Sequence, residues 1–304
     1  MSTPTAAERT STLGQALRAA SKRLAAADVD SPRLAAEALL SHTLDLSRAH
    51  LLAHLEQSLS LSHFADYQTL VDRCESGEPL AYVLGHREFY GLDFVVDPRV
   101  LIPRPETELL IETAIAIAHA RSGNPDREYR IADIGTGSGA IAVTLAAHLP
   151  QASIIAIDIS PEAIEVAREN ARRHAVADRI EFKVGDLLTP IDAPLDVVAA
   201  NLPYVRSAEW AYLSRSIRHY EPEVAFNGGS DGLGLVRQLL DAAPHALRPG
   251  GSILMEIGAS HGDAAIELAR DAFPAADIQV KTDMAGLDRL LVVRTRDTRR
   301  AQRF

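Results

Sequence analysis

The stretch that most constrains the fold runs from Ile131 to Leu145, IADIGTGSGAIAVTL. Apolar residues lead directly into a loop with glycine at positions 135, 137 and 139, and the loop leads directly into a helical pattern. This order predicts a strand, a tight turn and a helix. Because glycine has no Cβ, such a turn can take positive φ angles and let a ligand approach its backbone closely.

An acidic residue follows this loop at a spacing typical of nucleoside-binding folds. Asp158 ends the next apolar run, Ile154 to Ile157, and lies nineteen residues after Gly139. A carboxylate about twenty residues beyond a glycine loop commonly holds ribose hydroxyls. The loop also satisfies the dinucleotide pattern G-x-G-x-x-G/A, so by itself it indicates a nucleoside cofactor without saying which one.

The composition argues against several classes of protein. The chain carries 31 basic and 41 acidic residues, a formal charge of −10, which opposes attraction to nucleic acid backbones, so no direct nucleic acid binding is expected. The single cysteine, Cys74, excludes an internal disulfide, and the 11 histidines lack metal-ligand spacing, so no metal is assigned. No apolar run is long enough for a membrane span or a signal peptide, and we expect a cytoplasmic protein.

Residues 1–80 are expected to form a small helical domain. Three stretches carry apolar residues at three- and four-residue spacing. Ser31 followed by Pro32 is interpreted as an N-cap with proline at the first helical position, Ser62 as the cap of the third helix, and Gly77 as its end. This domain either recognises a protein substrate or only buttresses its neighbour, and the residues leave both open.

Residues 81–104 are expected to form a linker with structure of its own. Aromatic and β-branched residues flank Gly91, so Glu88 to Val96 is predicted to be a short hairpin. Pro105 then suits the first position of a helix from Glu106 to Arg121.

In residues 105–304, apolar strands alternate with helical patterns, which favours an α/β domain with a mostly parallel, Rossmann-like sheet. Ser160 and Pro161 should begin the helix after Asp158. Ligands of such sheets bind beyond the carboxyl ends of the strands, where the glycine loop, Asp158, Asp186 and Asn201 all fall. The seven predicted strands are Ile131–Ile134, Ser153–Asp158, Ile180–Val184, Val197–Ala200, Ser252–Ile257, Ile278–Lys281 and Leu290–Val293.

The tetrapeptide Asn201-Leu202-Pro203-Tyr204 suits the chemistry of planar amino groups. An amide nitrogen is a poor nucleophile because its lone pair is delocalised. If Asn201 Oδ1 and the Leu202 carbonyl each accept one N–H, the lone pair is directed at an electrophile. Pro203 restricts Leu202 to extended conformations, and Tyr204 could stack on the planar group.

NLPY resembles the (D/N/S)-P-P-(Y/F/W) motif of amino-group methyltransferases that use S-adenosylmethionine, with leucine in place of the first proline. Together with GEPLAYVLGHREFYG, LIPRPETELLIE, IADIGTGSGAIAV, EPEVAFNGGSDGLG and DMAGLDR, it resembles the protein-(glutamine-N5) methyltransferases known as HemK or PrmC along nearly the whole chain. That family methylates the glutamine of the Gly-Gly-Gln motif in peptide chain release factors. The resemblance implies a class I methyltransferase fold of seven strands, a helical N-terminal domain and a hairpin linker.

The resemblance also implies roles for individual residues. It assigns the ribose of S-adenosylmethionine to Asp158, the adenine to the neighbourhood of Asp186 and Leu187, and a further cofactor contact to Asn201. The methionine part falls on the loop residues Gly135, Thr136, Gly137, Ser138 and Gly139. The glutamine pocket falls on Asn201, Leu202, Pro203 and Tyr204. Glu221, Pro222, Gly228 and Gly229 also match family positions, but the sequence gives them no chemical role.

Alternative functions remain at this stage. The same amide-like chemistry would suit a methyltransferase acting on adenine in DNA or RNA, or one acting on a ribosomal protein glutamine. The corner Ile102 to Glu108, IPRPETE, resembles that of the release-factor enzymes, whereas the resemblance implies a different corner in the ribosomal-protein enzymes. A non-catalytic nucleoside-binding module and a nicotinamide oxidoreductase also fit the glycine loop, but the oxidoreductase gives no reason for NLPY.

Overall fold

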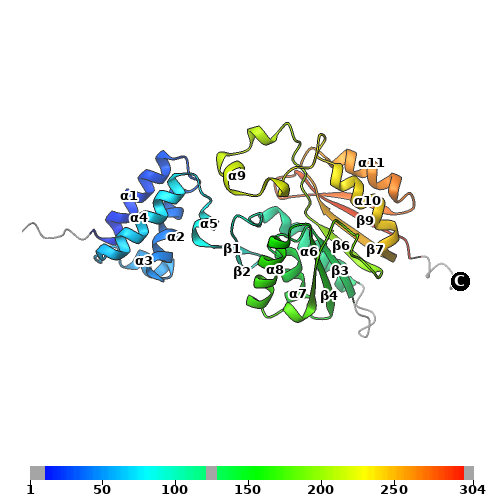
Figure 1. Cartoon of the computed structure of the whole chain (residues 1–304), viewed down its shortest axis with the longest axis horizontal. Helices are drawn as coiled ribbons and strands as arrows, with labels where there is room; N and C mark the ends of the chain where they lie inside the picture. The colour runs from blue at the N-terminus through cyan, green and yellow to red at the C-terminus, as the bar shows by residue number, and fades with distance from the viewer. Residues whose placement is uncertain (1–10, 121–128, 298–304) are drawn as a thin grey trace, which may run out of the picture. The chain divides into compact units, whose positions relative to one another are not determined.

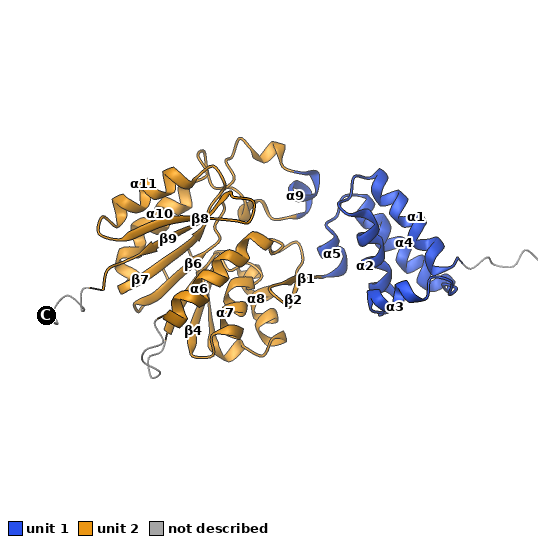
Figure 2. Ribbon diagram, turned by 180° about the vertical axis from the view of Figure 1, so that it is seen from behind, with its two compact units in different colours: residues 1–85, 214–220 blue, residues 86–213, 221–304 orange. Residues whose placement is uncertain are grey.

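The computed structural model describes residues 11–120 and 129–297, and the chain divides into two compact units (Figures 1 and 2). One unit contains residues 1–85 and 214–220, and the other contains residues 86–213 and 221–304. The boundary at residue 85 falls inside the expected linker of residues 81–104. Segment 214–220, which the sequence pattern put with the sheet, is grouped with the helices.

Within the described residues, the regular elements of the first unit are all helices, as expected. Its core is mostly leucine and alanine, and Tyr67 is fully buried in it with its hydroxyl donating to the Ala36 carbonyl at 3.1 Å. Cys74 is buried in the same core, where burial raises the pKa of its thiol to about 11. The helices are α1 (Leu13–Ala26), α2 (Pro32–Leu44), α3 (Arg48–Ala53), α4 (Leu61–Glu75), α5 (Leu80–Leu84) and α9 (Arg215–Tyr220).

The helix ends in this unit correct two of the expected caps. The cap of α4 is Ser60 rather than Ser62, because the Ser60 hydroxyl accepts the backbone N–H of His63. Ser31 does precede Pro32 at the start of α2, but its backbone is left-handed and its side chain makes no capping hydrogen bond. Gly77 follows the end of α4 with a φ of 99°, which fits its expected role as a helix terminator.

The second unit begins with the predicted hairpin. Strands β1 (His86–Phe89) and β2 (Leu92–Val95) pair in antiparallel register around Tyr90 and Gly91, which both have positive φ. After it, a 3₁₀ turn at Pro105–Thr107 leads into α6 (Glu108–Ala120), so the expected helix begins with one tighter turn. Its expected last residue, Arg121, lies outside the described residues.

The sheet has seven strands in the order β5-β4-β3-β6-β7-β9-β8. Figure 1 labels β4, β3, β6, β7 and β9 of this sheet. Neighbours from β5 to β7 pair in parallel, and β9 is antiparallel to both β7 and β8. The seven predicted strands and the mostly parallel sheet are thus confirmed. The strands are β3 (Tyr129–Ile134), β4 (Ala152–Asp158), β5 (Ile180–Val184), β6 (Leu195–Ala200), β7 (Leu247–Glu256), β8 (Asp277–Thr282) and β9 (Asp288–Arg294).

Helices cover both faces of this sheet. The helices of this unit after α6 are α7 (Ala140–His148), α8 (Pro161–Arg173), α10 (Gly234–Ala246) and α11 (Gly262–Ala272), with 3₁₀ turns at Ala177–Arg179, Trp210–Tyr212 and Glu223–Ala225. Because successive strand residues face opposite sides, Ala132 and Ile134 of β3 join a core with α10 and α11, while Asp133 between them bonds to α7. Within the described residues, no helix is both long and apolar enough to cross a membrane.

Candidate active site

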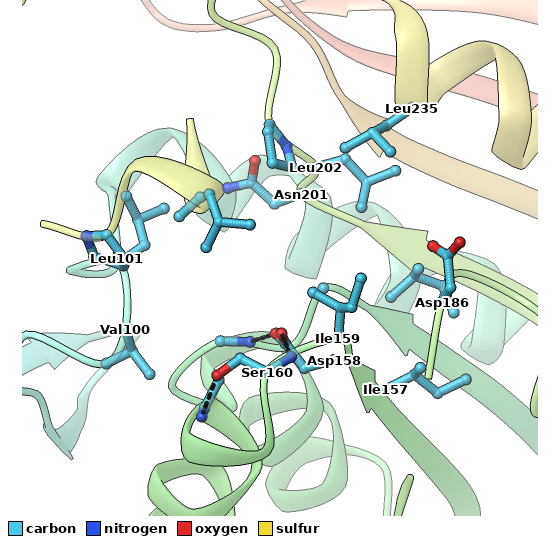
Figure 3. A pocket seen from close by; sticks show the side chains of 18 of the residues that line it. Val100, Leu101, Ile157, Asp158, Ile159, Ser160, Asp186, Asn201, Leu202 and Leu235 are labelled. Atoms are coloured by element: carbon cyan, nitrogen blue, oxygen red, sulfur yellow. Dashed lines mark hydrogen bonds between the residues drawn. The ribbon is translucent and has the colours of Figure 1, made fainter. Parts of the chain in front are cut away.

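A cavity of about 450 Å³ opens beyond the carboxyl ends of β3, β4, β5 and β6 (Figure 3). It lies where the chain order reverses between β3 and β6, which is the switch point at which such sheets bind ligands. The sequence-predicted residues that line it are Gly135, Gly137, Asp158, Asp186, Leu187, Asn201, Leu202 and Pro203.

The glycine loop has the backbone that its sequence predicts. Gly135, Gly137 and Gly139 all have positive φ, at 72°, 54° and 80°. The loop is tied to the neighbouring strand, because the backbone N–H groups of Gly135 and Thr136 both donate to the Ile157 carbonyl at 2.9 Å. Gly139 faces α8 instead of the cavity, and a Cβ there would lie 3.1 Å from the Ala167 Cβ. Gly135 and Gly137 therefore form part of the cavity wall, whereas Gly139 allows α8 to pack closely.

Asp158 is fixed at the end of β4 by hydrogen bonds from the backbone. Its Oδ2 accepts the Gly137 N–H at 2.8 Å and its Oδ1 accepts the Ser160 N–H at 3.0 Å (Figure 3). Burial raises the pKa of this carboxyl, and the backbone bonds act against that rise. As predicted, Ser160 caps α8 and Pro161 is its first residue.

The carboxyl group of Asp133 also holds the glycine loop in place, and it was not predicted from the sequence. Asp133 is fully buried, and its Oδ2 accepts the Thr136 hydroxyl at 2.6 Å and the Ala142 N–H at 3.0 Å. Burial raises the pKa of Asp133 from 3.8 to about 7. An acidic residue inside an apolar strand directly before the glycine loop was the signal that could have found it.

Much of the cavity lining is apolar, and most of its charged groups are acidic. Leu187 has a positive φ beside Asp186, and the exposed side chains of Ile159 and Val224 also line the space. Such surfaces suit a flat heterocycle. The charged groups of the lining are three carboxyl groups, those of Asp158, Asp186 and Glu223, and one guanidinium, that of Arg99.

That guanidinium is already paired, because Arg99 donates to both carboxylate oxygens of Asp97. The described lining of the cavity therefore carries an excess of negative charge, which favours a ligand with net positive charge.

Asn201 lines both this cavity and a smaller one of about 50 Å³ beside it. Its Nδ2 donates to the Thr107 hydroxyl at 3.0 Å, and that hydroxyl donates to Glu256 Oε2 at 2.6 Å. Burial raises the pKa of Glu256. Thr107 and Glu256 were not predicted as site residues, although Thr107 belongs to the corner singled out in the sequence.

The other residues of the tetrapeptide differ in what they contact. Leu202 is buried, and a Cβ on Gly135 would lie 3.2 Å from its Cδ2, so the leucine packs on the glycine loop. Pro203 lines the main cavity. Tyr204 is not among the described residues that line either cavity, and its hydroxyl donates to Glu256 Oε1 at 3.3 Å. Thr136 and Ser138 line only the smaller cavity.

A second glycine-rich segment packs against the back of this tetrapeptide. The Gly228 N–H donates to the Val205 carbonyl at 2.8 Å, and a Cβ on Gly228 would lie 2.7 Å from the Pro203 carbonyl oxygen. A Cβ on Gly232 would lie 2.4 Å from the Tyr204 carbonyl oxygen. These glycines therefore let two backbone segments approach closely, which is the role that the sequence could not give to Gly228.

Glu221 and Pro222 also acquire roles. The Glu221 carboxylate is buried and accepts both the Ile102 N–H at 3.1 Å and the Arg104 guanidinium, so it clamps the IPRPETE corner. Pro222 lines the main cavity. The described residues contain no group of three or more His, Cys, Asp or Glu side chains that could hold a metal ion.

Comparison with known proteins shows which family the chain belongs to. A model of the PrmC N-terminal domain matches residues 15–85, and a methyltransferase domain model matches residues 125–273. A release factor glutamine methyltransferase of Moorella thermoacetica is 44% identical over 287 residues, which cover 94% of this chain and 99% of that protein. The chain belongs to the release factor glutamine methyltransferase family.

Further members of the release factor glutamine methyltransferase family match over most of their length. The protein of Koribacter versatilis is 42% identical, and the match covers 93% of this chain and 98% of that protein. The protein of Bacillus anthracis is 36% identical, and the match covers 84% of this chain and 90% of that protein. The resemblance of the sequence motifs to this family is confirmed, and the protein is an enzyme of the methyltransferase class.

Solved structures agree with the fold. The hMettl16 catalytic domain, determined in complex with a MAT2A 3'UTR hairpin, has a TM-score of 0.54 at 20% identity and covers 74% of this chain and 82% of that one. A methyltransferase of Pyrococcus furiosus has a TM-score of 0.50 at 17% identity, and the match covers 74% of this chain and 97% of that one. At such low identity they support the class I methyltransferase fold alone.

Proposed function

We propose that this protein methylates the side-chain amide nitrogen of the glutamine in the Gly-Gly-Gln motif of peptide chain release factors, with S-adenosylmethionine as the methyl donor. The observation that carries the proposal is Asn201, which stands at the carboxyl end of β6 and lines a cavity together with the glycine loop. A carboxamide there matches an amide substrate, and the names of the relatives agree with that substrate.

The described residues fit S-adenosylmethionine. The positive φ angles of Gly135 and Gly137 bring bare backbone to the cavity, and Asp158 offers carboxylate oxygens for ribose hydroxyls. The apolar side chains near Asp186, including Leu187, suit an adenine ring. The cofactor carries a net positive charge, which the acidic lining favours. It supplies an electrophilic methyl group on its sulfonium, and nothing in the proposal requires a metal.

The tetrapeptide positions the glutamine. Asn201 Oδ1 and the Leu202 carbonyl each accept one N–H of the substrate amide, which turns the nitrogen lone pair toward the methyl donor. Pro203 keeps Leu202 extended so that its carbonyl stays aimed. The methylated nitrogen becomes acidic enough to lose its proton to water, so no strong base is needed.

The helical unit is proposed to recognise the release factor, because the PrmC N-terminal domain model covers it. Such a substrate puts the reaction in the cytoplasm, where translation ends. Relatives that are 42–44% identical to this chain are named for release factors, which favours the proposed substrate over adenine, a ribosomal protein glutamine, a nicotinamide reaction and a non-catalytic nucleoside-binding role. Direct nucleic acid binding is not expected from the net charge of −10.

The deciding experiment measures methyl transfer from labelled S-adenosylmethionine to the release factor of the same organism. A release factor whose Gly-Gly-Gln glutamine is changed to alanine serves as the control substrate. Label on the native factor alone is the expected result. Equal labelling of both factors, or none on either while S-adenosylhomocysteine still binds, contradicts the proposed substrate.

A further inference from the structure

The side-chain amide of Asn201 could point either of two ways. Rotation by half a turn exchanges Oδ1 and Nδ2 in almost the same space, but the two ends differ chemically, since one accepts and the other donates hydrogen bonds. Only the arrangement with Oδ1 free can accept an N–H of the substrate amide. The proposed function therefore requires something that fixes the direction of this amide.

The hydrogen bonds behind Asn201 have a fixed direction. The Thr107 hydroxyl has one hydrogen, and it is used in the 2.6 Å bond to Glu256 Oε2. The lone pairs of that hydroxyl are what remains to face Asn201, so they can pair only with a donor. Nδ2 is the donor end, and it lies 3.0 Å away. Oδ1 is left without a bond from this chain of groups.

Both partners are shielded from bulk solvent. Thr107 is 4% exposed and Glu256 is 3% exposed. The second oxygen of Glu256 accepts the Tyr204 hydroxyl, and the nearby charged groups are Glu106 and Arg289. An unmade hydrogen bond at a buried carboxylate oxygen would be costly, which favours the bond that Glu256 Oε2 accepts from the Thr107 hydroxyl.

We propose that Thr107 and Glu256 are positioning residues that hold the Asn201 amide with Oδ1 toward the substrate. The proposal rests on the function proposed above and adds two residues to its site. They lie 94 and 55 residues from Asn201 in sequence, on the corner before α6 and at the end of β7. Neither needs to touch the substrate amide to act.

Two substitutions at Thr107 separate the hydroxyl from the packing. Thr107→Val keeps the shape but removes the hydroxyl, whereas Thr107→Ser keeps the hydroxyl and removes a methyl group. We expect kcat to fall about 100-fold in Thr107→Val, as for other small displacements of a reacting group. In Thr107→Ser, kcat should stay within about fivefold of the wild-type value. The opposite order of the two variants, or full activity in Thr107→Val, overturns the proposal.

Two substitutions at Glu256 test the hydrogen bond that this residue accepts from Thr107. Glu256→Gln retains one oxygen that can accept from Thr107, whereas Glu256→Leu retains none, so we expect the glutamine variant to be at least tenfold more active. Equal loss in both would mean that the charge is what matters and would overturn the positioning role. Adding Glu256→Leu to Thr107→Val should cost no more than about threefold further, because both act through one amide. S-adenosylhomocysteine affinity within threefold of the wild-type value shows that each variant is folded.

A readout without catalysis separates this proposal from the proposed function. The side-chain NH₂ signals of Asn201 in an ¹⁵N correlation spectrum, assigned by their absence in Asn201→Ala, should shift in Thr107→Val and stay near their wild-type positions in Thr107→Ser. Unmoved signals in Thr107→Val overturn the positioning role. Shifted signals in a protein that does not methylate release factors would leave the network standing and reject the function.

Discussion

At the scale of single residues, neighbours in the tetrapeptide contribute in different ways. Asn201 offers its side chain to the cavity, whereas the proposed contribution of Leu202 is a backbone carbonyl that every residue has. The Leu202 side chain is 5% exposed and packs on the glycine loop. Stability and activity should therefore respond differently to truncation at the two positions.

We predict that Leu202→Ala lowers the free energy of unfolding by about 2–3 kcal/mol, because it leaves a gap against Gly135. Its kcat should stay within about tenfold of the wild-type value, since the carbonyl remains. Asn201→Ala is the matched comparison and should lose about 10²- to 10³-fold in kcat with little change in stability. Chemical denaturation and methyl-transfer rates measure both. A Leu202→Ala protein that is stable but inactive would show that the side chain itself matters.

Asp133 makes stability depend on pH. Its folded pKa of about 7 lies above its ordinary value of 3.8, so between about pH 4 and pH 7 the folded chain holds a proton that the unfolded chain has released. This group therefore lowers the free energy of unfolding as pH rises through that window, by up to about 4 kcal/mol. Asp133→Asn should flatten the slope, since an amide can keep the bonds to Thr136 and Ala142. Denaturation at pH 5 and pH 8 tests this, and an unchanged slope in Asp133→Asn refutes it.

At the scale of elements, the glycine-rich segment behind the tetrapeptide offers a controlled comparison. Gly232 and Gly229 both have positive φ, but a Cβ on Gly232 would collide with the Tyr204 carbonyl oxygen, whereas one on Gly229 meets nothing within 4 Å. Gly232→Ala should displace the tetrapeptide and lower kcat at least tenfold. Gly229→Ala should cost only the backbone strain of about 1 kcal/mol. Similar kcat values in the two variants would show that the close approach does not position the site.

The elements that the sequence predicted best are those whose signal is continuous along the chain. Parallel strands buried on both faces are nearly continuous apolar runs, and β4 and β6 are of this kind, so their sequences predict them directly. Short pieces such as α3 and α9 have too few residues for a helical period to be seen. Ser60 and Ser62 are both able to cap α4, and only the backbone geometry decides between them.

The same limit applies to the candidate site, where a residue can be proposed from the sequence only if its signal lies within a few positions along the chain. The glycine loop, Asp158 and NLPY each signal their chemistry within a few residues. The bond from Asn201 to Thr107 joins residues 94 positions apart, and the bond from Thr107 to Glu256 joins residues 149 positions apart. Such pairs leave no local pattern, because the fold alone brings them together.

At the scale of the whole molecule, the two units have separate hydrophobic cores. Leu39 is fully buried in the helical core and Leu239 is fully buried against the sheet, which gives a matched pair for leucine-to-alanine substitution. Each change should cost about 2–5 kcal/mol in its own unit. In calorimetry, S-adenosylhomocysteine should raise only the unfolding temperature of the unit that contains the sheet. Leu239→Ala should lower that same unfolding temperature, and Leu39→Ala should leave it unchanged. One transition moved equally by both variants would mean that the units unfold together.

Strand β9 has a consequence for how the protein is made. It is the latest of the described strands to be synthesised, yet it lies inside the sheet, between β7 and β8. Until the ribosome has added it, β7 has an open edge and β8 has no neighbour in the sheet. The nascent sheet therefore carries unpaired backbone groups until Asp288 to Arg294 have been translated, and a chain cut short before Asp288 would lose the middle of that half of the sheet and not merely its border.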